Sequence, residues 1–297
     1  MVARVFSTAT IVTPLQVWPI FTAFGSPPPT ASTAALSPIT PISATSDAAA
    51  APHSKSNKTE IEWRMKPVGI FRTSSTEGPG YFATYLERRS IPWQLVALDE
   101  GGAVPRDARI FSGLAVMGGP MSANDDLPWI APLLELLRNA VRQDVPVIGH
   151  CLGGQLMSRA FGGAVKVNPV REIGWGQVRV ADNGVAREWL GELQAFETFQ
   201  WHGETFSIPP GATRILEGEH CANQAFALGK HLGMQCHVEM TPELVRTWIG
   251  TGAAEIAAHR RSLAVQQPAE MQRDLEPRLE RLHQIADRIY ERWTSSL

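Results

Sequence analysis

The sequence is poor in cysteine and carries almost no surplus of charge. Three cysteines among 297 residues, irregularly spaced, are too few for a disulfide framework or a structural zinc site. A net charge of −2 gives no reason to expect nucleic acid or an anionic membrane as a partner. Because 44% of the residues are apolar, the chain can still bury a globular core. We expect neither a metal nor any other cofactor. The three cysteines are Cys151, Cys221 and Cys236.

Residues 1–64 lack the charge and the apolar periodicity of a folded domain. Arg4 is the only charged residue before position 47, and Ala, Ser, Thr and Pro dominate. This composition predicts a disordered extension. A targeting segment is one interpretation, but two prolines interrupt the apolar stretch 11–24 and no clean cleavage site follows. We favour a true start of translation at Met65, because a strand-like pattern begins at once with Val68–Phe71.

Strand-like and helix-like patterns alternate in the next part of the chain, which we assign to one domain over residues 65–250. The alternation predicts an α/β, doubly wound, mostly parallel sheet with helices on both faces. In such sheets, ligands gather at the carboxyl ends of the strands. The expected strands are Val68–Phe71, Trp93–Leu98, Leu114–Met117 and Val145–Ile148, with helices at Tyr81–Arg89 and around Leu133–Val141.

Beyond Phe161 the pattern predicts shorter strands and turns, including a strand at Leu232–Cys236. Two helices are expected to close the chain, a short one at Pro242–Ile249 and a long amphipathic one from Ala269 to Trp293. The apolar stripe of the long helix is typical of a packing surface rather than a site. We assign residues 251–297 to a C-terminal helical extension.

The segment from Asp144 to Gln155 places a cysteine between a strand and a helix. Val145–Ile148 is rich in β-branched residues, and an apolar helical pattern begins at Leu152. With Cys151 at the turn, this layout is that of a nucleophile elbow in which cysteine replaces serine. The positive end of the following helix favours a nucleophilic thiolate, and the amide of Leu152 would point to where an oxyanion develops.

A cysteine nucleophile needs a base, and two histidines compete for that role. His202 and His237 are each followed two residues later by a glutamate, Glu204 and Glu239. In a strand, residues i and i+2 share a face, so the carboxylate can orient the imidazole. His237 follows an apolar strand, whereas a glycine separates His202 from its glutamate. The pattern therefore favours His237 as the base, with Glu239 as its orienting partner.

Four motifs resemble those of the class I (Cys-His-Glu) glutamine amidotransferases. The resemblance covers about residues 68–240 and is closest to stand-alone relatives of the glutaminase domain of guanosine monophosphate synthase, a set that includes γ-glutamyl peptidases. Small departures from the family pattern occur at His150, Gly154, Cys236 and Val238. The motifs are Gly118-Gly119-Pro120, Gly149-His150-Cys151-Leu152-Gly153-Gly154-Gln155, Trp201-His202-Gly203-Glu204 and Gly233-Met234-Gln235-Cys236-His237-Val238-Glu239.

The resemblance also implies roles for residues outside the cysteine, histidine and glutamate set. The amide of Gly119 would be the second donor of the oxyanion hole, beside that of Leu152. The substrate would be bound by Gln155, Trp201, His202 and Gly203. His237 and Glu239 occupy the family's base-and-orienter motif, so His202 is expected to position substrate.

The predicted function is hydrolysis of the γ-amide of glutamine, or of a γ-glutamyl compound, through a cysteine thioester. A partner-dependent subunit that supplies ammonia to a synthase in trans is one alternative. A non-catalytic glutamine-binding protein and another cysteine hydrolase of the same fold are two more. The last is kept open by His150, which we expect to face away from the thiol. Because Cys151 is needed as a free thiol, we predict a cytoplasmic location.

Overall fold

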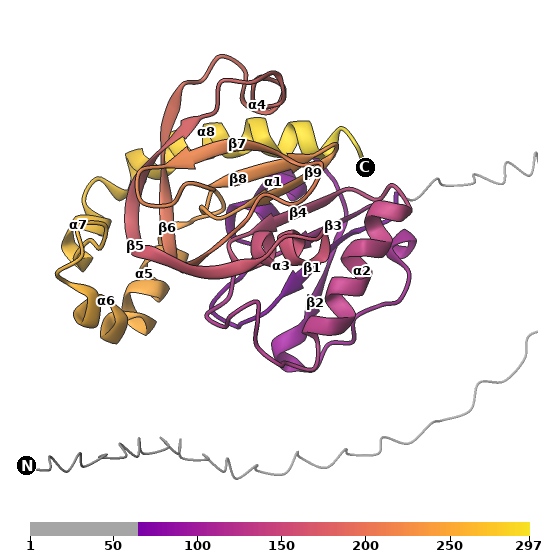
Figure 1. Cartoon of the computed structure of the whole chain (residues 1–297), viewed down its shortest axis with the longest axis horizontal. Helices are drawn as coiled ribbons and strands as arrows, with labels where there is room; N and C mark the ends of the chain where they lie inside the picture. The colour runs from indigo at the N-terminus through magenta and orange to yellow at the C-terminus, as the bar shows by residue number, and fades with distance from the viewer. Residues whose placement is uncertain (1–64) are drawn as a thin grey trace, which may run out of the picture. The chain divides into compact units, whose positions relative to one another are not determined.

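The computed structural model describes residues 65–297, and the predicted extension over residues 1–64 lies outside them. Within the described part, nine strands form one sheet in the order β2-β1-β3-β4-β9-β8-β7-β5-β6 (Figure 1). The parallel strands are β2 (Trp93–Ala97), β1 (Val68–Arg72), β3 (Gly113–Val116), β4 (Val147–His150) and β9 (His231–Met234). The antiparallel strands are β8 (Ala225–Leu228), β7 (Thr213–Gly218), β5 (Val165–Val180) and β6 (Ala195–Phe206).

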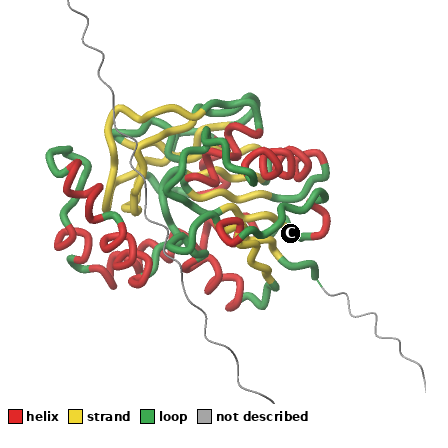
Figure 2. The backbone as a smooth tube through the Cα atoms, turned by 90° about the horizontal axis from the view of Figure 1, so that it is seen from below, coloured by secondary structure: helices red, strands yellow, loops and turns green. Residues whose placement is uncertain are grey.

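Helices cover both faces of the sheet (Figure 2). On one face, α1 (Gly80–Arg88) and α8 (Leu275–Thr294) pack in one apolar cluster with Ile70 of β1. On the other face, α2 (Ile130–Arg142) and α3 (Leu152–Ala160) pack in a second cluster with Phe71. Neighbouring residues of one strand thus point to opposite faces, as the pleat requires. The remaining helices are α4 (Gly184–Leu190), α5 (Pro242–Thr251), α6 (Ala253–His259) and α7 (Pro268–Gln272), with short 3₁₀ turns η1 (Leu98–Glu100) and η2 (Ala108–Ile110).

The predicted α/β, doubly wound fold is confirmed, with parallel pairing confined to the half of the sheet that contains β1. The expectation of shorter strands after Phe161 is wrong for β5 and β6, which are 16 and 12 residues long. Their mutual antiparallel pairing continues through a register shift between Val167 and Glu172. Long-range pairing therefore overrides the turn-forming residues of this segment.

The long C-terminal helix begins later than predicted. The sequence indicated one helix from Ala269, but Asp274 adopts a left-handed conformation (φ +52°) that separates α7 from α8. The apolar side of α8 packs into the same core as α1, and Tyr81 donates a hydrogen bond of 2.8 Å to Asp287. The packing role predicted for the stripe is therefore met inside the chain. The boundary placed at residue 250 stays a prediction.

The carboxyl ends of β1, β3, β4 and β9 share one edge of the sheet, because these strands are parallel. The chain leaves that edge as residues 73–79 after β1, 117–120 after β3, Cys151 after β4 and 235–239 after β9. Four loops thus meet where ligands of such sheets gather. Among the helices of residues 65–297, none has the length and apolar character required to span a bilayer.

Candidate active site

Cys151 lies at a strained turn between β4 and α3. Its backbone has φ +50° and ψ −107°, a conformation that residues other than glycine rarely adopt. The first turn of α3 packs directly on the sheet: a side chain on Gly153 would overlap the carbonyl oxygen of Val116, and one on Gly154 that of Met234. These close approaches require glycine. They hold the start of the helix, and hence the cysteine, at the edge of the sheet.

His237 and Glu239 form a buried pair, with 2.6 Å between Nδ1 of the imidazole and Oε1 of the carboxylate. Burial alone would raise the pKa of Glu239, but the charge and the hydrogen bond of His237 outweigh it and lower that pKa to about 2. Burial likewise opposes a charged imidazole, yet the Glu239 carboxylate and the nearby Cys151 thiol raise the pKa of His237 well above its usual value. The pair therefore favours a protonated imidazole beside an ionised carboxylate.

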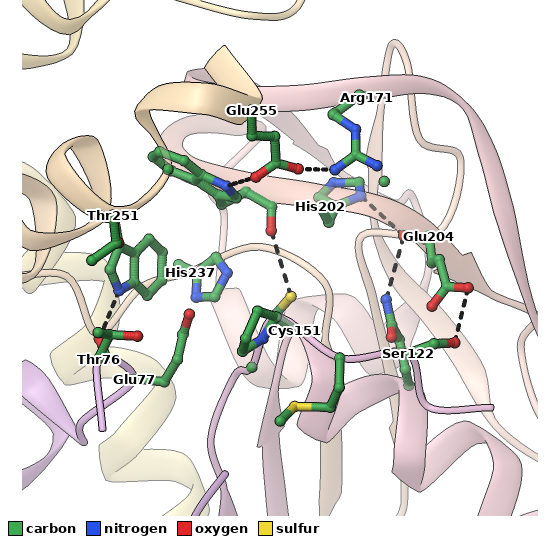
Figure 3. Close-up of a pocket in the computed structure, with 18 of the residues that line it drawn as sticks. Thr76, Glu77, Ser122, Cys151, Arg171, His202, Glu204, His237, Thr251 and Glu255 are labelled. Carbon is green, nitrogen blue, oxygen red and sulfur yellow. Dashed lines mark hydrogen bonds and ion pairs between the residues drawn. The ribbon is translucent and has the colours of Figure 1, made fainter. Parts of the chain in front are cut away.

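The thiol of Cys151 faces the same cavity as His237 (Figure 3). The side-chain amide of Gln235 lies 3.5 Å from the sulfur, and the carbonyl oxygen of Trp201 lies 3.8 Å from it. The second imidazole nitrogen, Nε2, is buried and has no well-formed hydrogen bond within residues 65–297. It is therefore available to exchange a proton with the sulfur or with a bound molecule.

The two His-x-Glu pairs make different contacts in the structure. The carboxylate of Glu204 accepts a hydrogen bond of 3.0 Å from Ser122 instead of holding His202. Nδ1 of His202 lies 3.0 Å from the backbone carbonyl of Glu204, and Nε2 lies 3.1 Å from the carboxylate of Glu172. Only His237 therefore contacts the side-chain carboxylate of the glutamate that follows two residues later. Sequence reasoning missed Glu172, which lies opposite His202 in the neighbouring strand β5.

A cavity of about 510 Å³ joins most of the predicted site residues. Leu152 and Glu239 lie behind its wall, and the other predicted residues line it. Above the cysteine, Glu255 accepts a 2.8 Å hydrogen bond from the indole of Trp201 and forms an ion pair with Arg171. The predicted residues on the wall are Gly119, Cys151, Gln155, Trp201, His202, Gly203 and His237.

The two predicted oxyanion donors lie next to each other. A side chain built on Gly119 would begin 2.8 Å from Cδ2 of Leu152 and 2.6 Å from the sulfur of Met121. Within residues 65–297, the amide of Gly119 donates no hydrogen bond. The loop after β3 thus packs against the side chain of the first residue of α3, and the oxyanion-hole role of the two amides stays a prediction. Gln155 is buried close by and donates a 3.2 Å hydrogen bond to Gln235.

His150 is fully buried behind the pair formed by His237 and Glu239. Its Nε2 lies 3.1 Å from the hydroxyl of Tyr290 and 3.8 Å from the second carboxylate oxygen of Glu239. Burial lowers the pKa of His150, which favours the neutral imidazole. Its ring contacts Glu239 and α8 rather than the cavity. Tyr290 was missed in the sequence because only packing of α8 brings it here.

Glu172, His202 and Cys221 could in principle hold a metal ion, since their ligand atoms lie within 4.8 Å of one another. The carboxylate already accepts a 3.1 Å hydrogen bond from Gln224 in addition to its contact with His202. Burial raises the pKa of Cys221 to about 11, which disfavours the thiolate that a metal requires. The carboxylate and the thiol of the cluster are thus hydrogen-bonded to Gln224 and Thr205, beside the ring of His202.

Comparison with known proteins places the site in a family context. The family described as glutamine amidotransferase class-I matches residues 82–252, more than half of the chain. A solved glutamine amidotransferase from Methylobacillus flagellatus is 47% identical, with a TM-score of 0.77, covering 78% of this chain and 96% of that chain. A glutamine amidotransferase-like protein of Salmonella typhimurium is 32% identical over 206 residues, 66% of this chain and 85% of that protein. A glutamine-hydrolysing GMP synthase of Vibrio vulnificus is 32% identical over 140 residues, 46% of this chain but 26% of that protein.

Proposed function

The chain belongs to the class I glutamine amidotransferase family, and on this basis we propose that it hydrolyses the γ-amide of glutamine or of a γ-glutamyl compound. The observation that carries the proposal is the 2.6 Å contact between His237 and Glu239, buried beside a cysteine held at a strained turn. A nucleophile, a base and a group that orients the base are the parts that covalent acyl transfer needs.

In this mechanism the Cys151 thiolate attacks the γ-carbonyl carbon while His237 holds the proton of the thiol. The amides of Gly119 and Leu152 stabilise the oxyanion, and each such donor is worth about 3 kcal/mol in the transition state. The carbon–nitrogen bond then breaks as the imidazolium gives its proton to the leaving amine. Water, deprotonated by His237, attacks the thioester, releases glutamate and restores the thiol. Glu239 orients the imidazole throughout both steps.

The glutamyl part of the substrate would lie on the opposite side of Cys151 from His237. His202 and Glu204 lie on that side (Figure 3), and Gln155 donates a 3.4 Å hydrogen bond to the carbonyl of Glu204. Trp201 and Gly203, the neighbours of His202 in the chain, also line the cavity. The ring of His202 is held through Nδ1 by the carbonyl of Glu204, and its Nε2, beside the Glu172 carboxylate, has no hydrogen bond within residues 65–297, which suits a residue that positions a ligand. His202 would then act on binding rather than on proton transfer.

The alternative is a subunit that becomes active only with a synthase partner. An independent hydrolase needs its nucleophile and base assembled in the isolated chain, and the proximity of Cys151 to His237 favours that proposal. A protein that only binds glutamine has no need of the buried ion pair. We expect the full chain to release glutamate from glutamine and from a γ-glutamyl dipeptide without a partner.

The test is glutamate release by the purified full chain, compared with Cys151→Ala. Turnover above the level of the variant on either substrate supports the independent hydrolase. A folded protein that binds glutamine but matches the variant on both substrates would favour the partner-dependent subunit or the binding protein.

A further inference from the structure

Glu77, in the loop between β1 and α1, reaches the same point as the nucleophile and the base. A side chain built on Gly118 would begin 2.7 Å from the Glu77 carboxylate, 3.3 Å from Cε1 of His237 and 3.7 Å from Cβ of Cys151. Three chemical groups from three loops thus converge on one glycine. The proposed mechanism gives this carboxylate no role.

The carboxylate of Glu77 has no partner within the described residues. It forms no hydrogen bond and no ion pair there, although it lines the cavity. Burial raises the pKa of Glu77 to about 7, with a smaller contribution from Glu239 and an opposing one from His237. A carboxylate removed from water at this cost gains free energy when a cation or a hydrogen-bond donor enters the cavity beside it.

The geometry of the proposed reaction decides which part of a substrate meets Glu77. The leaving nitrogen must reach Nε2 of His237 to receive its proton, so the leaving group lies on the His237 side of Cys151. Figure 3 shows Glu77 on that side, with His202 and Glu204 on the other. Thr76, Trp248 and Thr251 complete this half of the cavity, and Trp248 is fixed by a 2.8 Å hydrogen bond to the carbonyl of Thr76.

Among the described residues, no lysine or arginine lies in the leaving-group half of the cavity, and the charge of His237 beside Glu77 is already paired with Glu239. Arg171 is the one Lys or Arg among the described residues that line the cavity, and it is paired with Glu255. The α-carboxylate of an amino-acid leaving group would therefore approach Glu77 without compensation. An amine with a second, protonated amino group would instead pair with the carboxylate in a partly desolvated site, where such a contact is strong.

We propose that Glu77 forms a leaving-group subsite for cationic amines, so that the preferred substrates are γ-glutamyl amides of short aliphatic diamines. This inference rests on the proposed function. The reaction is the same hydrolysis: water cleaves the amide carbon–nitrogen bond, and glutamate and the free diamine are released. Glu77 binds the distal ammonium and takes no part in bond cleavage.

The test compares kcat/KM for the mono-γ-glutamyl amide of 1,4-diaminobutane with that for γ-glutamyl n-butylamide, which has a similar length and no distal charge. We expect a preference of at least about tenfold for the diamine, the size of one charge-assisted contact. In Glu77→Gln the ratio should fall to near one. In Glu204→Gln, a matched change on the other side of Cys151, the ratio should stay near that of the natural protein.

Product inhibition supplies a second measurement that needs no variant. Free 1,4-diaminobutane should inhibit glutamine hydrolysis competitively and n-butylamine should not. A ratio near one in the natural protein, or an equal loss of activity on both amides in Glu77→Gln, would overturn the subsite. If glutamine is still hydrolysed, either of these results excludes the Glu77 subsite but not the proposed function. If no substrate yields glutamate, both the proposed function and the subsite are wrong.

Discussion

Nδ1 of His237 lies 2.6 Å from the carboxylate of Glu239, two residues further along the chain. The same spacing occurs at His202 and Glu204, but there the carboxylate turns to Ser122. The i, i+2 spacing allows a histidine–glutamate contact but does not ensure it. In the second pair a glycine separates the two residues, and the hydroxyl of Ser122 binds the carboxylate instead. His237 and Glu239 are also both buried. Because they are removed from water, the charges of the imidazole and the carboxylate attract each other strongly.

Two substitutions separate the roles of the histidines. We expect His237→Ala to lower kcat by ~10²-fold or more, the range of a lost general base. His202→Ala should act mainly on KM, because a positioning contact is made in the ground state and the transition state alike. Steady-state kinetics on glutamine distinguish the two. A large loss of kcat in His202→Ala with His237→Ala nearly unaffected would exchange the assigned roles.

A glutamine analogue with an electrophile at Cδ, the carbon of the side-chain amide, should alkylate Cys151 in preference to the other cysteines. Burial raises the pKa of Cys221 to about 11 and that of Cys236 to about 12, so both remain thiols at neutral pH. Peptide mapping after a short incubation locates the label. Equal labelling of Cys221 in folded protein would contradict the assignment.

Gly118 should tolerate no side chain. In Gly118→Ala the added methyl group would start 2.7 Å from Glu77 and 3.3 Å from His237, so one of them must move. The Glu77 carboxylate can move without affecting bond cleavage, so the effect on kcat comes from a small shift of His237, and we expect a loss on the order of tenfold. Gly184→Ala is the control, since nothing lies within 4 Å of the added carbon. Activity of Gly118→Ala close to that of this control would show that the convergence is not required.

His231 should make stability fall in mild acid. Burial lowers its pKa to about 4 from an ordinary 6.5, with a smaller contribution from Lys230. Between pH 4 and pH 6.5, His231 is therefore protonated in the unfolded chain but neutral in the folded protein. Stability is therefore complete above pH 6.5 and decreases as pH falls toward 4, by up to about 3 kcal/mol.

Denaturant unfolding of His231→Gln at pH 7 and pH 4.5 measures this contribution. Its pH dependence should be weaker than that of the natural protein by on the order of 2 kcal/mol, whereas His259→Gln, at an exposed position, should leave it unchanged. Identical pH dependence in both variants would assign the acid sensitivity to other groups.

The sequence predicts the parts of the site that depend on local order along the chain. The elbow at Cys151 follows from a β-branched strand, small residues and an amphipathic helix. The pairing of His237 with Glu239 follows from their spacing, although both lie in the segment after β9 and not in a regular strand. Both are properties of short segments. Residues that belong to the sequence motifs, such as Gln155 and Gly203, also line the cavity.

Other features depend on packing between distant segments, and the sequence does not specify them locally. Glu77 approaches the nucleophile because β1 and β3 are neighbours in the sheet. Tyr290 reaches His150 because α8 packs across α1, 140 residues further along the chain than His150. The helix is interrupted between α7 and α8 because Asp274 adopts a left-handed backbone conformation, which the sequence pattern did not predict. Such contacts become visible only when the topology is known.

The central claim is that Cys151 forms a γ-glutamyl thioester with the substrate. The most direct test is mass spectrometry of the full chain after brief incubation with glutamine and acid quenching, followed by peptide mapping. We predict a γ-glutamyl adduct on the peptide that contains Cys151, and none in Cys151→Ala. Steady glutamate production without an adduct on Cys151, or with Cys151→Ala equally active, would contradict the account.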